Sequence, residues 1–160
     1  MILSIDPGNV YSAYVLIDSS TLKPLDAVKT DNYTVLKYIE SAISKDKNIE
    51  FAIEMIASYG MPVGAEVFET CLWIGRFIEK IFESTGKEPT LIYRREVKLN
   101  LCESVKANDS NIIQALIDRF AKNVPNKGKG TKKEQGWFYG FSKDIWQSYA
   151  VGITYIDTKI

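Results

Sequence analysis

The order of strand-like and helical segments constrains the fold of this chain more than any other feature. Apolar, β-type residues fill three closely spaced segments near the N-terminus and two later ones: MILSID, YSAYVLID, LDAVKTD, IEFAIE and PTLIYRR. Pro7 and Gly8 separate the first two segments and indicate a hairpin, and the third is typical of an edge strand. A meander followed by alternating strands and helices predicts an α/β fold with a mixed five-stranded sheet flanked by helices.

Four segments have the apolar spacing of helices, at residues 33–44, 63–82, 109–121 and 143–155, and Ser142 is a candidate N-cap for the last. Residues 123–140 are rich in Gly, Lys and Asn, and we expect them to form a mobile loop over a binding surface. No repeat or linker divides the chain, so we expect a single domain over residues 1–160.

The composition favours a cytoplasmic protein without a membrane partner. No apolar run approaches the ~20 residues that span a bilayer. Met1 leads directly into a strand-like segment, which leaves no room for a signal peptide. Cys71 and Cys102 lie in apolar surroundings without a CxxC spacing, so we expect buried free thiols in a reducing compartment.

The complete absence of histidine narrows the chemistry. It excludes Ser-His-Asp and Cys-His catalysis and nearly every catalytic zinc site. Hydrolysis by such a chain would have to use carboxylates, and carboxylates prefer hard cations such as Mg²⁺ or Mn²⁺.

Three acidic residues stand at the ends of predicted elements. Asp6 and Glu54 end apolar strands, and Asp144 lies in the first turn of the last helix. Each has an ordinary explanation alone: a turn residue before proline, a surface acid, and a charge favoured by the helix dipole. Together they indicate a metal site, because bridging carboxylates can hold two divalent ions ~4 Å apart that stabilise both ends of a phosphodiester displacement.

Three ordered motifs resemble those of the RuvC-type Holliday-junction resolvases of the ribonuclease H-like superfamily. ILSIDPGNVYSAYVLID resembles the first motif, FAIEMIASYG the second and FYGFSKDIWQSYAVGITY the last, so the resemblance covers most of the chain. In its short length and in the segment KANDSNIIQALIDRF, the chain resembles the bacteriophage members of this family. The resemblance implies a ribonuclease H-like fold and a metal-dependent endodeoxyribonuclease. Such an enzyme resolves four-way DNA junctions by paired phosphodiester hydrolysis in recombination or phage DNA processing, in the host cytoplasm for a phage protein.

The resemblance also implies roles for individual acids. The family's catalytic, metal-binding acids fall on Asp6, Glu54 and Asp144, with Mg²⁺ or Mn²⁺ as the cofactor. A fourth acid usually follows one helical turn after the third, but this chain has Gln147 there, whose amide oxygen is a weak ligand. Asp109 is a further weak candidate, with helix capping as its simplest role.

Basic and aromatic residues provide candidates for DNA binding. The net charge is zero, but residues 118–143 are rich in lysine, and such a patch suits either phosphate binding or a solvated loop. The resemblance places Lys143 at the scissile phosphate and makes Tyr59 a candidate wedge in an opened junction, although packing would also explain Tyr59. The aromatic residues at 137–139 either stack on bases or anchor the loop. The loop lysines expected to contact phosphates are Lys127, Lys129, Lys132 and Lys133.

The family acts as a homodimer that cuts two opposed strands. The resemblance therefore implies that the helix at 63–82 contributes to a dimer interface, with Trp73 and Phe77 as candidates that are equally suited to the core. Two other functions stay open: a broader structure-selective nuclease for forks and flaps, and a branched-DNA-binding protein with weak or no cleavage, which Gln147 favours. An ATPase of the same fold is disfavoured, because the chain lacks a P-loop and a second domain.

Overall fold

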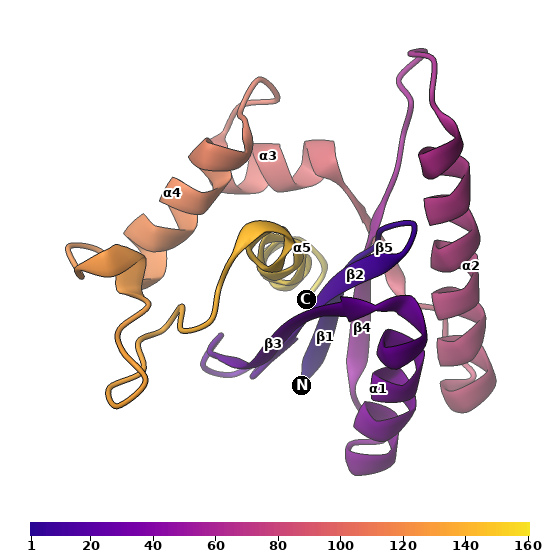
Figure 1. The fold of residues 1–160 in the computed structure, drawn as a ribbon, viewed down its shortest axis with the longest axis horizontal. Helices are drawn as coiled ribbons and strands as arrows, with labels where there is room; N and C mark the ends of the chain where they lie inside the picture. The colour runs from indigo at the N-terminus through magenta and orange to yellow at the C-terminus, as the bar shows by residue number, and fades with distance from the viewer.

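The computed structural model describes all 160 residues and contains a mixed β-sheet with helices on both faces (Figure 1). The strands β1 to β5 span Ile2–Asp6, Tyr11–Ile17, Pro24–Asp31, Glu50–Met55 and Thr90–Tyr93. Their order in the sheet is β3-β2-β1-β4-β5. The first three strands form an antiparallel meander, whereas β4 and β5 run parallel to β1. The predicted five-stranded mixed sheet, with β3 at an edge, is confirmed.

The helices divide between the two faces of the sheet. The helices α1 to α5 span Asn32–Lys45, Ala65–Thr85, Arg94–Cys102, Asp109–Phe120 and Lys143–Lys159. Two of them, α1 and α2, cover one face, while α5 crosses the other face and carries α3 and α4 on its outer side (Figure 1). All of these helices except α3 were predicted from apolar spacing.

The helix α3 begins where the sequence predicted more strand. The segment PTLIYRR predicts a strand that includes Arg94 and Arg95, but β5 ends at Tyr93. The carboxylate of Glu96 accepts a hydrogen bond from the backbone N–H of Tyr93 at 2.9 Å, which caps the first turn of α3. Glu96 also forms an ion pair of 3.1 Å with Lys159 at the end of α5. A local cap and a tertiary contact therefore favour helix over strand here.

Side chains alternate between two cores, one on each face of the sheet. In β1, Leu3 and Ile5 pack with α1 and α2, whereas Ile2 packs with α5. In β4, Ile53 joins the first group and Ala52 the second. Because alternate residues of a strand point to opposite faces, the α5 side also receives Ser4 and then Asp6 of β1, and Glu54 of β4.

The helix α5 lies unusually close to β1. The hydroxyl of Ser148 donates a hydrogen bond of 2.9 Å to the backbone carbonyl of Ser4. One turn later, Gly152 has so little room that an added Cβ would stand 2.3 Å from Cδ1 of Ile17 and 3.0 Å from Cβ of Ser4. Two small residues in α5 thus permit the close approach, which fixes where the N-terminal end of the helix lies.

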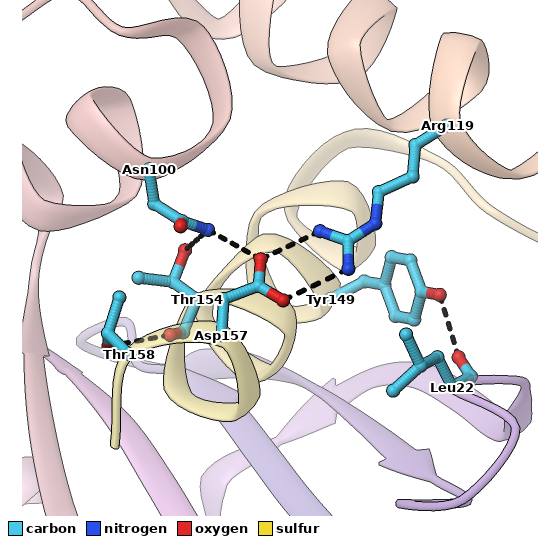
Figure 2. A network of polar contacts seen from close by, with 7 residues as sticks. All are labelled: Leu22, Asn100, Arg119, Tyr149, Thr154, Asp157 and Thr158. Atoms are coloured by element: carbon cyan, nitrogen blue, oxygen red, sulfur yellow. Dashed lines mark hydrogen bonds and ion pairs between the residues drawn. The ribbon is translucent and has the colours of Figure 1, made fainter. Parts of the chain in front are cut away.

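Polar contacts hold α3 and α4 against α5 (Figure 2). The carboxylate of Asp157 in α5 accepts bonds of 2.7 and 3.0 Å from Arg119 in α4 and one of 2.9 Å from Asn100 in α3. Burial acts to raise the pKa of Asp157, but these hydrogen bonds and the Arg119 charge outweigh it and leave the pKa below its usual value. Beside Arg119, the Tyr149 hydroxyl of α5 donates to the backbone carbonyl of Leu22 at 2.8 Å.

The loop at residues 123–140 is anchored to the core near its C-terminal end, whereas residues 131–135 are exposed, and its mobility stays a prediction. It contains a short 3₁₀ turn, Asn126–Gly128, and an isolated β-bridge between Gly130 and Gln135. Phe138 is fully buried, so it anchors the loop and is not available to stack on bases. Trp137 stacks on Phe120 with ring centroids 5.1 Å apart and donates a hydrogen bond of 3.0 Å to the Tyr149 hydroxyl. Aromatic residues at the end of the loop therefore fix it beside α4 and α5.

In α2, the predicted burial of Cys71 is wrong, and the structure decides between the two roles considered for Phe77. Cys71 is exposed, because the helix buries Thr70, Ile74, Phe77 and Ile81, and this face does not include position 71. Phe77 is fully buried in the core between α2 and the sheet, so it is a core residue and cannot form an interface. Cys102 is partly buried, and both thiols are free. None of the helices combines the length and the apolar character needed to span a membrane.

The close contact of α5 with β1 predicts that Gly152→Val destabilises the protein. Overpacking of a tight core site costs about 1–3 kcal/mol. The control is Ser41→Val, which places the same β-branched side chain at an exposed position of α1. Urea unfolding at pH 7 measures both variants. A Gly152→Val variant as stable as the control would contradict the contact.

Candidate active site

Two acidic side chains meet at the ends of adjacent parallel strands. Ile5 of β1 pairs with Ile53 of β4, so Asp6 and Glu54 are next in register and both face α5. Both side chains are only partly exposed. The pKa of Asp6 is raised well above its usual value, first by burial and then by the charge of Glu54 and a hydrogen bond with it. The strand register therefore places the two carboxylates side by side.

The third predicted acid, Asp144, approaches from α5. Its charge adds to the raised pKa of Asp6, after the larger effects of burial and of Glu54. The carboxylate of Asp144 forms an ion pair with Lys29 of β3. Lys29 lies opposite Ala13 of β2, and Ala13 in turn pairs with Asp6, so the ion pair extends across the strand ends.

The guanidinium group of Arg94 is the centre of the polar contacts in this site. Its Nη1 lies 3.7 Å from Oε1 of Glu54 and donates a hydrogen bond to the amide oxygen of Gln147. Its Nη2 forms an ion pair with Asp109 at the start of α4. Arg94 also acts to lower the pKa of Asp6, against the larger effects that raise it. One basic side chain thus joins β4, α4 and α5.

The site contains all five candidates for metal binding, but not in a complete ligand shell. As the side chains stand, no group of three or more acidic or cysteine residues is arranged to hold a metal ion. Glu54 and Asp109 face Arg94, and Asp144 faces Lys29. The chemistry of the donors nevertheless fits a hard divalent cation, because carboxylate oxygens converge and repel one another around Asp6.

Sequence reasoning missed Arg94 and Lys29, which contact these acids directly. The signal for Arg94 was the pair of arginines that follows the apolar run PTLIY, next to the strand that ends in Glu54. Lys29 had no comparable signal, because a lysine on an edge strand is usually only a solvated surface residue.

The predicted DNA-binding residues lie in two separate places. Tyr59 is 65% exposed and lines a shallow groove together with Arg94, Arg95, Lys98 and Val105. The loop that carries Lys127, Lys129, Lys132 and Lys133 lies on the α4 side of the molecule, far from the β4–α2 connection that carries Tyr59 (Figure 1). Lys143 is exposed at the first position of α5, next to Asp144, and has no ion-pair partner.

No family model and no curated protein matches the sequence. Among solved structures, the chain is similar to a Thermus thermophilus RuvC structure, with 14% identity and a TM-score of 0.65 over 96% of this chain and 92% of the other. The chain has the fold of RuvC. A second similar structure is T. thermophilus RuvC in complex with a Holliday junction substrate, with 10% identity and a TM-score of 0.66 over 96% of this chain and 91% of that one. The likeness to RuvC confirms the predicted ribonuclease H-like fold.

The burial of Asp6 and the repulsion from its neighbouring acids predict that Asp6→Asn stabilises the metal-free protein at pH 7. A raised pKa in the folded state means that ionised Asp6 opposes folding above that pKa, and that the cost disappears below its unfolded value near ~4. We expect Asp6→Asn to gain about 1 kcal/mol at pH 7 and nothing at pH 3. Thermal unfolding in chelator at both pH values measures this gain, with the exposed Asp118→Asn as control. A loss of stability at pH 7 would contradict the close approach of these acids.

Proposed function

We propose that this chain is a metal-dependent endonuclease that resolves four-way DNA junctions. The observation that carries the proposal is the convergence of Asp6, Glu54 and Asp144 from β1, β4 and α5 at one end of the sheet. The similarity of the fold to a RuvC solved with a Holliday junction substrate supports this choice of DNA. The cellular role that follows is DNA recombination or phage DNA processing in the cytoplasm.

The reaction is the hydrolysis of a phosphodiester. A water oxygen bonds to phosphorus, the bond from phosphorus to one sugar oxygen breaks, one water proton ends on that oxygen and the other on the new phosphate monoester. Asp6, Glu54 and Asp144 would hold Mg²⁺ or Mn²⁺, which supplies positive charge for the attacking and leaving oxygens when bound.

Other side chains would position the substrate and the acids. Lys29 holds the carboxylate of Asp144 through its ion pair, and Arg94 orients the Gln147 amide. The exposed ammonium group of Lys143 is free to contact the scissile phosphate, beside the acid at the start of α5.

The groove beside the site provides a path for DNA. Its basic side chains are Arg94, Arg95 and Lys98, and no acidic residue lines it. Arg94 belongs to both the groove and the acidic site, so a strand that follows the groove reaches the acids. Tyr59 stands exposed at the same groove, where its ring can stack on an unpaired base. The distant loop lysines would contact a second arm of a branched substrate through its phosphates.

We further propose that the protein acts as a homodimer through the outer face of α2. Phe68 and Leu72 are 64% and 69% exposed on that face, one helical turn apart, which is unusual for large apolar side chains. Trp73 is half-buried against Phe77 and Tyr33, so it supports the helix from inside. Two copies joined in this way would present two sites to two strands.

Cleavage of end-labelled DNA tests the proposed function. With Mg²⁺ or Mn²⁺, we expect paired symmetrical nicks in a four-way junction and a loss of at least ~10²-fold in rate for Asp6→Asn. Forks, flaps and linear duplex of the same sequences serve as control substrates. Equal cutting of all branched substrates would instead favour a general structure-selective nuclease. Tight junction binding without cleavage under either metal would favour a binding protein, as the neutral Gln147 allows.

Sedimentation of the free protein tests the dimer. We expect Leu72→Arg to sediment as a monomer, because a charge placed in an apolar interface opposes association. Its control is Leu25→Arg, which puts the same change at a side chain that is 52% exposed on edge strand β3. A dimer that survives Leu72→Arg, or a monomeric wild-type protein, would contradict the proposed interface.

A further inference from the structure

The position of Arg94 is fixed by the backbone on both sides of it. It is the first residue of α3 and directly follows β5, whose Ile92 pairs with Glu54 and whose Tyr93 pairs with Met55. The cap from Glu96 holds the helix start in place. Because β5 pairs with β4, the side chain of Arg94 starts next to the strand that carries Glu54 and lies beside its carboxylate.

The atoms that surround the guanidinium group of Arg94 are of the kind that coordinate metal ions in proteins. Its side chain is only 24% exposed, and its three neighbouring oxygens come from Glu54, Asp109 and Gln147. These are two carboxylates and one amide oxygen, which are ligands typical of hard cations. Arg94 therefore supplies a fixed positive charge on the side of the site that contains Glu54 and Gln147.

The charges around the site leave room for one divalent ion. Among the groups that contact one another, with every group ionised and the exposed Lys143 left to the substrate phosphate, the four carboxylates of Asp6, Glu54, Asp109 and Asp144 face the two basic groups of Arg94 and Lys29. The remaining charge of minus two equals that of one divalent cation, whereas two such ions would leave an excess of positive charge. The neutral amide of Gln147, which accepts a hydrogen bond from Arg94, adds no charge to this balance.

We propose that Arg94 takes the place of a second metal ion, so that the site binds a single divalent cation per chain. This inference rests on the proposed function. The ion would be held on the side of Asp6 and Asp144, and the guanidinium supplies the second positive charge beside the phosphate. Its fixed N–H donors suit phosphate oxygens well. In the hydrolysis described above, Arg94 transfers no proton and only stabilises negative charge on the phosphate oxygens.

Counting bound Mn²⁺ in the absence of DNA tests the proposal, because the count does not depend on cleavage. In an electron paramagnetic resonance titration, we expect one Mn²⁺ per chain for the wild type and for the control Arg95→Gln, whose side chain is exposed on the same helix. Gln147→Asp alone should still bind one ion, because Arg94 pairs with the new carboxylate. The double variant Arg94→Gln, Gln147→Asp should bind two.

Cleavage gives a second readout for the same residue. We expect Arg94→Gln to lose about 10²-fold or more in rate while it still binds one Mn²⁺, and Arg94→Lys to recover part of the rate. Circular dichroism checks that each variant is folded.

The outcomes separate the failure of this inference from that of the proposed function. Two Mn²⁺ ions bound to the wild type would overturn the role of Arg94 and leave the nuclease proposal intact. A folded double variant that binds only one ion would do the same. If no form binds Mn²⁺, both the inference and the metal site of the proposed function are wrong. If the double variant does not fold, the number of Mn²⁺ ions bound by the wild type decides whether Arg94 replaces a second metal ion.

Discussion

The close contact between α5 and β1 is the constraint on which the rest of the structure depends. The helix can reach the strand because Ser148 and Gly152 are small, and the Ser148 hydroxyl bonds to the backbone of Ser4. This approach brings the first turn of α5 over the ends of β1 and β4, where Asp6 and Glu54 emerge. A larger residue at position 152 would lift the helix and move Asp144 away from the other two acids.

The site balances repulsion between acids against ion pairs that span several elements. Burial and then the neighbouring carboxylates of Glu54 and Asp144 raise the pKa of Asp6, so its ionised form opposes folding. Arg94 and Lys29 reduce that cost by pairing with the flanking carboxylates. Unfavourable interactions of this kind are common at functional sites. The residues there are determined by the reaction, and packing elsewhere in the protein offsets their cost in stability.

The same arrangement links the acids to the surfaces that would meet DNA. Arg94 contributes to the acidic site and to the basic groove with Tyr59, so the two are continuous. The aromatic anchors Phe138 and Trp137 hold the lysine-rich loop at the opposite side of the molecule. Two separated basic regions suit a branched substrate, whose arms leave the cut point in different directions.

The sequence alone was sufficient to predict the sheet, four of the helices and the strand ends at Asp6 and Glu54, because apolar periodicity is a local property of the chain. The exposure of Cys71, the start of α3 and the burial of Phe138 depended on tertiary packing. The ion pairs of Arg94 and Lys29 could not be predicted either, since residues 29 and 144 lie far apart in the chain and meet only once α5 crosses the sheet. Periodicity determines which face of an element is buried, but only the packed structure determines which charges become neighbours.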